Sequence, residues 1–200
     1  MKLFKRFWGK PDPQAQLESL LLAIEQGDQN QVALLVRKQP DVLEGRNIYG
    51  MWPLLYAVYR QQEAIVTQLL SLGANPNPPP REETTPLNLA VLEGLDRIAG
   101  ELLQHGAELD RRDPYGASAL MYAAQRGHVV LAKRLLEAGA DLQARDHEGD
   151  TVLMYAVSHR QPQMVKLLLD QGADPQLRNY DNQTALDKAF DPQIQALLEG

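Results

Sequence analysis

Residues 118–128 read SALMYAAQRGH, and 33 residues further along the chain residues 151–160 read TVLMYAVSHR. The leucine of the shared Leu-Met-Tyr-Ala string recurs with this spacing, and an alanine follows it three positions later each time. Gly-Ala pairs keep the same spacing. The repeating positions are Leu54, Leu87, Leu120, Leu153 and Leu186, then Ala57, Ala90, Ala123, Ala156 and Ala189, and Gly73, Gly106, Gly139 and Gly172. Such a fixed period is the sequence signature of a repeat protein.

Each repeat is expected to hold two short helices. Thr85 offers a hydroxyl N-cap, and Pro86 stands at the first helical position, where no amide hydrogen is missed. Leucine and alanine three positions apart then give the helix one buried edge, so Leu120 and Leu153 are expected in the core. The expected cap residues are Thr85, Ser118, Thr151 and Thr184, whereas Trp52 before Pro53 cannot cap. One unit of about 33 residues buries too little apolar surface to offset its loss of backbone entropy, so neighbouring units must stack.

Two strings carry a family resemblance: TTPLNLAVLEG at residues 84–94 and SALMYAAQRGHVVLAKRLLEAGADLQARD at residues 118–146. Over roughly residues 15–200 the chain resembles the ankyrin-repeat family. The resemblance implies an all-α solenoid of stacked helix-turn-helix units with hairpin-like loops. We expect a basic amphipathic segment at residues 1–13 and a repeat domain at residues 14–200. The expected parts of that domain are an N-terminal cap at about 14–45, repeats at about 46–78, 79–111, 112–144 and 145–177, and a C-terminal cap at 178–200.

The chain also departs from the family pattern. The resemblance implies a hydrogen-bonding histidine at the fourth position of the Thr-Pro-Leu-His string, but this sequence has none there; the residues are Leu55, Asn88, Met121, Met154 and Asp187. After Ala189 the next leucine pair follows in eight residues instead of twelve. About one helical turn is therefore expected to be missing from the last unit, as suits a terminal cap.

Composition and charge narrow the function classes. The chain has no cysteine and a formal net charge of −6, with four basic residues and no acid in residues 1–10. The acidic remainder repels phosphate backbones, so we expect no nucleic-acid partner. Asp146, His147, Glu148 and Asp150 form the one compact set of metal-type ligands, but they lack the spacing of a calcium loop. We therefore expect no catalytic residues, metal or cofactor, and His105 and His128 are interpreted as capping or solvated residues.

The predicted binding face follows from the resemblance, because ankyrin proteins usually bind protein partners through the hairpin tips and the exposed, concave side of the first helices. Three of the five tips carry tyrosine, a residue that is enriched at interface hot spots. The stripe Tyr56, Tyr122 and Tyr155 is interpreted mainly as packing between repeats. The predicted partner-binding residues are Ile48, Tyr49, Met51, Tyr59, Arg81, Glu82, Leu92, Pro114, Tyr115, Gln125, Arg126, His147, Glu148, Ser158, His159, Tyr180 and Asp181.

The sequence thus predicts a non-enzymatic, cytoplasmic adaptor or immunity-type inhibitor that is a monomer until it binds one protein partner. The alternative is a membrane-surface organiser, since Phe4, Phe7 and Trp8 lie opposite basic residues on a helix and suit an anionic surface. Two other interpretations of that segment are that its aromatic side chains dock on the first repeat or that it is disordered. The proline-rich loop at residues 75–83 is either a rigid tip that adds specificity or a tolerated variant.

Overall fold

The computed structural model describes residues 12–77 and 84–200, and within these ranges every regular element is helical. The predicted all-α fold is therefore confirmed. Phe4, Phe7, Trp8, Arg81 and Glu82, which carry expected functions, lie outside the described residues. The α-helices are α1 (Pro13–Gln26), α2 (Gln29–Lys38), α3 (Pro53–Tyr59), α4 (Glu63–Ser71), α5 (Pro86–Leu92), α6 (Asp96–Gln104), α7 (Ala119–Arg126), α8 (Val129–Glu137), α9 (Val152–Ser158), α10 (Pro162–Asp170) and α11 (Pro192–Glu199); the 3₁₀ helices are η2 (Pro40–Glu44) and η3 (Leu186–Lys188).

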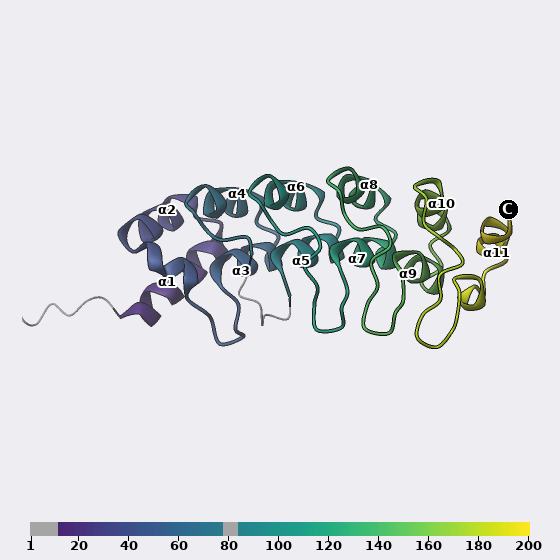
Figure 1. Cartoon of the computed structure of the whole chain (residues 1–200). Coiled ribbons are helices and arrows are strands. Elements are labelled where there is room, and N and C mark those ends of the chain that lie inside the picture. Colours follow the sequence, from purple (N-terminus) through teal and green to yellow (C-terminus); the bar gives the residue numbers. More distant parts are fainter. Residues whose placement is uncertain (1–11, 78–83) are drawn as a thin grey trace, which may run out of the picture. The chain divides into compact units, whose positions relative to one another are not determined.

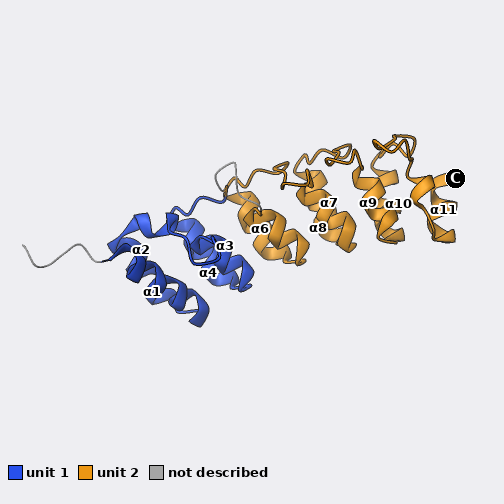
Figure 2. Cartoon of the chain, turned by 90° about the horizontal axis from the view of Figure 1, so that it is seen from below, with its two compact units in different colours: residues 1–76 blue, residues 77–200 orange. Residues whose placement is uncertain are grey.

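The chain divides into two compact units, residues 1–76 and residues 77–200 (Figure 2). In unit 1, α1 packs against α2 and α3, and α2 packs against α4. In unit 2, the first helices of successive repeats, α5, α7 and α9, pack side by side, and the second helices α6, α8 and α10 form another row (Figure 1). The loops that precede α7 and α9 project from that row (Figure 1). This arrangement matches the predicted stacking of two-helix units.

The periodic leucines form the centre of the core. Leu87, Leu120 and Leu153 are each only 1% exposed, as the repeat pattern predicts. Their partner alanines, Ala90, Ala123 and Ala156, are fully buried. Leu186 is the exception at 40% exposure, because η3 is a single 3₁₀ turn after which Ala189 continues with extended backbone. The shortened last unit thus keeps the sequence period but loses the buried helix edge.

Three of the four predicted N-caps are confirmed. Thr184 accepts the amide of Asp187 at 3.3 Å, but the N-cap residue of η3 is Ala185. The hydroxyls of Thr85, Ser118 and Thr151 each accept a hydrogen bond from the amide three residues later, whereas Trp52 makes no side-chain cap. At Met121 the sulfur in turn accepts the Ser118 amide at 3.5 Å, so methionine takes a polar contact at the fourth position of the string. These short-range bonds fix where α5, α7 and α9 begin.

Candidate functional site

The loop tips of unit 2 are built on buried side chains that turn the backbone. Asp146 Oδ1 accepts hydrogen bonds from the amides of Glu148 and Asp150, both at 2.9 Å. Asp113 accepts equivalent bonds from Tyr115 and Ala117, and Asn179 from Asp181 and Gln183. An Asx side chain that binds the backbone two and four residues ahead holds a tight turn. The side chains at positions 147–148 and their equivalents are thereby presented outward.

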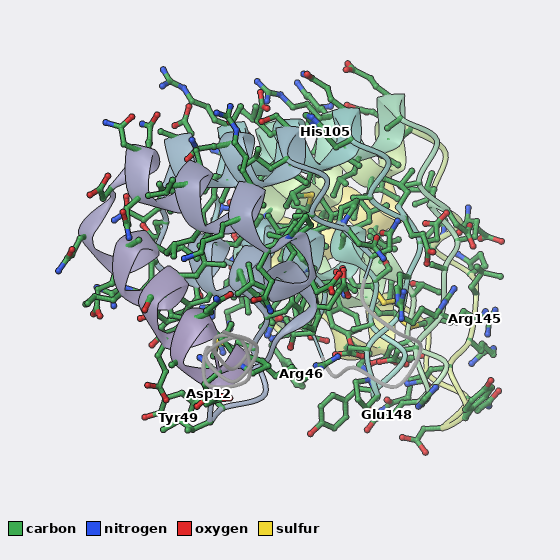
Figure 3. The ribbon with its side chains drawn as sticks, turned by 90° about the vertical axis from the view of Figure 1, so that its left-hand side faces the viewer. Asp12, Arg46, Tyr49, His105, Arg145 and Glu148 are labelled. Carbon is green, nitrogen blue, oxygen red and sulfur yellow. The ribbon has the colours of Figure 1, made fainter. Side chains whose placement is uncertain are left out.

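Adjacent tips in unit 2 are joined by backbone hydrogen bonds. The His147 amide donates to the Tyr115 carbonyl at 2.9 Å, and the Tyr180 amide donates to the Glu148 carbonyl at 3.0 Å. Figure 3 shows Glu148 at the outer end of the loops, whereas His105, which follows α6, lies at the opposite edge of the unit. The tips therefore form one continuous column of fixed spacing.

A ladder of arginines runs beside this column. Arg112 donates to the Arg145 carbonyl, and Arg145 donates to the Arg178 carbonyl at 2.8 Å. Arg178 closes the ladder on the carbonyl of Asn182 at 2.6 Å. The 33-residue spacing of these three arginines is visible in the sequence, but no structural role was predicted for them. Their guanidinium groups satisfy loop carbonyls, which stiffens the column behind the tips.

The tyrosine stripe ties the tips to the first helices. The Tyr155 hydroxyl donates to Asp146 Oδ2 at 2.8 Å, and the Tyr122 hydroxyl donates to Asp113 Oδ2 at 2.5 Å. Burial raises the pKa of both tyrosines well above its usual range, and the hydrogen bond to the carboxylate raises it further. Tyr122 and Tyr155 therefore stay neutral, and each bonds the loop of its own repeat rather than serving only to pack between repeats.

Tyr155→Phe tests this tie. We expect the substitution to lower the free energy of unfolding at pH 7 by about 1–2 kcal/mol, because Asp146 loses a hydrogen-bond donor at a half-buried site. Since the pKa of Tyr155 is raised on folding, this contribution is complete below the unfolded-state pKa of about 10 and falls progressively as the pH rises from there toward the higher folded-state pKa. Urea denaturation at pH 7 and near pH 11 measures both effects. The control is Tyr180→Phe, whose ring is 75% exposed and which should change stability at neither pH.

A groove of about 400 Å³ lies between the tip column and the first helices of unit 2. Seven of its ten lining residues belong to the predicted binding set: Pro114, Tyr115, Gln125, His147, Glu148, Ser158 and His159. Asp146, Asp150 and Tyr155 also line the groove but are not among the residues predicted for binding. Of the other predicted residues in the described part of unit 2, Leu92, Arg126, Tyr180 and Asp181 lie outside the lining.

His159 is held in place by its surroundings. Its ring stacks on Tyr155 with centroids 6.2 Å apart, and Nδ1 lies 3.0 Å from the Tyr155 carbonyl. That carbonyl can only accept, so Nδ1 carries a proton and, in the neutral ring, Nε2 accepts from the Gln125 amide at 3.3 Å. The wall of the groove is therefore an ordered imidazole and not a freely rotating side chain.

The groove is acidic and aromatic. Its lining contributes three carboxylates and no lysine or arginine. The carboxylate of Asp150 already has partners within the protein. It accepts a hydrogen bond from the Asn179 side chain at 2.7 Å and forms an ion pair with Lys188. Glu148 and the 76% exposed ring of Tyr115 remain open to solvent. Such surroundings favour a positively charged or hydrogen-bond-donating group against an aromatic face.

No metal-binding or membrane-spanning element is found in the described parts of the chain. Among residues 12–77 and 84–200, no three side chains of histidine, cysteine, aspartate or glutamate are placed to hold a metal ion. The carboxylates of Asp146 and Asp150 are engaged in the hydrogen bonds given above. Within the same ranges, no helix combines the length and apolar character that crossing a bilayer requires.

Unit 1 carries a second groove, of about 250 Å³. By the repeat period, Asn47 and Tyr56 occupy the positions of Asp146 and Tyr155, and Asn47 turns its loop in the same way. Of the predicted residues in this unit, Ile48 lines the groove, while Tyr49, Met51 and Tyr59 do not. The lining residues are Gln14, Glu18, Leu21, Leu22, Glu25, Asn47, Ile48 and Tyr56.

Comparisons with known proteins agree with this architecture. A family model described as ankyrin repeats (3 copies) matches residues 20–113 and again residues 87–179. The structure of an ankyrin repeat domain from Acinetobacter baumannii AYE has 28% sequence identity and a TM-score of 0.79, over 90% of this chain and 95% of that one. The ankyrin repeat protein EF0377 also has 28% identity, with a TM-score of 0.82 over 92% of this chain and 97% of its own. No curated protein matches the chain.

Proposed function

Because the chain belongs to the ankyrin-repeat family, we propose that it is a non-enzymatic adaptor or inhibitor that binds one protein partner through its loop tips and the exposed side of its first helices. Ankyrin repeats are generic protein–protein interaction modules, and the fold is in general a non-enzymatic scaffold. The observation that carries the proposal is the groove of unit 2, in which seven residues predicted for binding line one surface.

The physical state of this groove supports binding. Asx turns, backbone bonds between tips and the Tyr155–Asp146 bond order its walls before a partner arrives. A pre-ordered surface loses little conformational entropy on association. The acidic lining favours a partner segment that presents a lysine or arginine against Tyr115, since cations bind aromatic faces and nearby carboxylates.

The simultaneous change of Tyr49, Tyr115 and Tyr180 to alanine tests the proposal. The three side chains are 76%, 76% and 75% exposed, so the fold should be retained. One tyrosine that acts as a hot spot contributes about 2 kcal/mol, so we expect capture of the partner to fall more than about tenfold. Affinity purification from the native cell, followed by mass spectrometry and quantitative pull-down, measures this and identifies the partner.

Matched controls use exposed apolar residues on a second helix of each unit. Leu34→Ala on α2 and Val130→Ala on α8 remove side chains that are 61% and 57% exposed, and they should leave capture unchanged. Undiminished capture by the triple variant, with its circular dichroism intact, would place the binding face elsewhere. Assay of the purified partner with and without the chain then separates an inhibitor from an adaptor, because only an inhibitor lowers the partner's activity.

The membrane alternative is tested separately. It depends on Phe4, Phe7 and Trp8, which lie outside the described residues. Flotation with anionic liposomes compares the whole chain with a variant that lacks residues 1–13. Recovery of only the whole chain in the lipid fraction would support the membrane function, and equal recovery would remove it.

A further inference from the structure

The first helix of unit 1 exposes apolar surface where later first helices are covered. By the repeat spacing, Leu22 stands at the position of the tyrosine stripe, but leucine has no hydroxyl that could bond a loop, and it is 53% exposed. Helix α1 has 14 residues against 8 in α7, and the extra turns come before this position, where α7 is preceded by its loop tip. With Leu21 and with Ile48, which is 86% exposed, Leu22 forms the aliphatic part of the unit 1 groove.

The charge of this groove is one-sided. Helix α1 contributes Glu18 and Glu25 and carries no lysine, arginine or histidine. Glu25 pairs with Arg60, whereas Glu18 makes no ion pair with the described residues and only a 3.4 Å contact from the Gln14 amide. An apolar surface with an uncompensated carboxylate on its rim favours a segment that is both aromatic and basic.

The chain supplies such a segment directly before α1. Residues 1–11 read MKLFKRFWGKP, with four apolar or aromatic side chains at positions 3, 4, 7 and 8 and four basic ones. Their charge is opposite to that of α1. A cavity of about 250 Å³ is larger than the roughly 150 Å³ apolar cavity that accommodates benzene, so it can take a large aromatic side chain.

The segment can reach the groove. Asp12 has a non-helical ψ of 118° and caps the Gln14 amide, so the chain leaves the axis of α1 at this residue. Eleven residues span about 16 Å as a helix and up to about 36 Å when extended. The groove follows α1 from Gln14 to Glu25, which is about 16 Å at 1.5 Å per residue. Either conformation covers it.

We propose that residues 1–11 fold back along α1 and seat Trp8 or its aromatic neighbours in the unit 1 groove, as an intramolecular cover of Leu22 and Ile48. Because Ile48 also belongs to the predicted binding face, a partner of unit 1 would have to displace the segment. The inference goes beyond the proposed function and holds whether or not the tips of unit 2 bind a protein.

Tryptophan fluorescence tests the proposal, because the chain has only two tryptophans, Trp8 and Trp52. In Trp52→Phe all tryptophan emission comes from Trp8; if that variant is poorly folded, the wild-type spectrum minus that of Trp8→Phe isolates the same signal. We expect emission at shorter wavelength and acrylamide quenching several-fold weaker than in a peptide of residues 1–13. Leu22→Glu or Ile48→Glu should restore peptide-like values, whereas Leu34→Glu, on α2 and outside the groove, should not.

Other outcomes overturn the proposal. Peptide-like emission in the parent protein would show that the segment does not dock. Shielding that survives Leu22→Glu and Ile48→Glu would place the segment elsewhere, and shielding that disappears on dilution would indicate docking onto a second copy. Shielding that appears only with vesicles containing phosphatidylserine, and not with phosphatidylcholine alone, would assign the segment to the membrane.

Discussion

Leu120→Ala is expected to lower the free energy of unfolding by about 2–5 kcal/mol. Leu120 is 1% exposed in α7, the first helix that packs against both α5 and α9. Removal of its isobutyl group leaves a cavity that neighbours on both sides cannot fill, because each is held by its own repeat. Stacked repeats derive much of their stability from such interfaces, so the loss should spread to neighbouring units.

Urea denaturation followed by circular dichroism measures this effect. Val130→Ala is the matched control, since Val130 is 57% exposed on the neighbouring α8 and its truncation should change stability by no more than about 0.5 kcal/mol. A loss of less than about 0.5 kcal/mol in Leu120→Ala would contradict the alignment of the repeats, because that alignment places Leu120 and its equivalents in the core between the helices.

Gly116→Ala should destabilise the protein by about 2–5 kcal/mol and disorder the unit 2 groove. Gly116 has a φ of +82°, which costs a residue with a Cβ roughly 1–2 kcal/mol. The added Cβ would also lie 2.8 Å from the backbone nitrogen of His147, in the next tip. That atom is held by its hydrogen bond to Tyr115, so the tips must separate at a further cost of about 1–3 kcal/mol.

Gly139→Ala separates the two causes. Gly139 has a similar φ of +95°, but a Cβ built there would meet nothing within 4 Å. It should therefore lose only the roughly 1–2 kcal/mol of backbone strain and keep partner binding. Denaturation and the pull-down, run on both variants, compare them. Equal losses in the two variants would mean that the tips are not closely stacked.

The repeat architecture could be predicted from the sequence because the residues that determine it interact over short distances along the chain. A cap such as Thr85 binds an amide three residues away, and the leucine and alanine of each buried edge are one helical turn apart. The period then aligns these short-range patterns, and the burial of Leu87, Leu120 and Leu153 follows. At Leu186 the period holds but the leucine is 40% exposed, because η3 is a single 3₁₀ turn and not a full first helix.

The groove of unit 2 could be predicted only in part from the sequence. Position in the repeat identified the exposed tip residues Tyr115, His147 and Glu148, since a loop tip faces solvent wherever the units stack. It did not distinguish the polar residues that build the tips from those that are presented on them. Asp146 looked like a candidate metal ligand in the sequence, but it is buried and accepts hydrogen bonds from its own loop and from Tyr155.

The sequence by itself determined the period, the helix boundaries and the buried edge of each repeat, because these depend on interactions within one unit of 33 residues. Only the tertiary structure decided which side chains share a groove. The bond from His147 to Tyr115 and the occupation of Asp150 by Lys188 join residues that are 32 and 38 positions apart. The exposure of Leu22 was likewise decided there, since it depends on which parts of the fold pack against this side of α1 and not on the leucine itself.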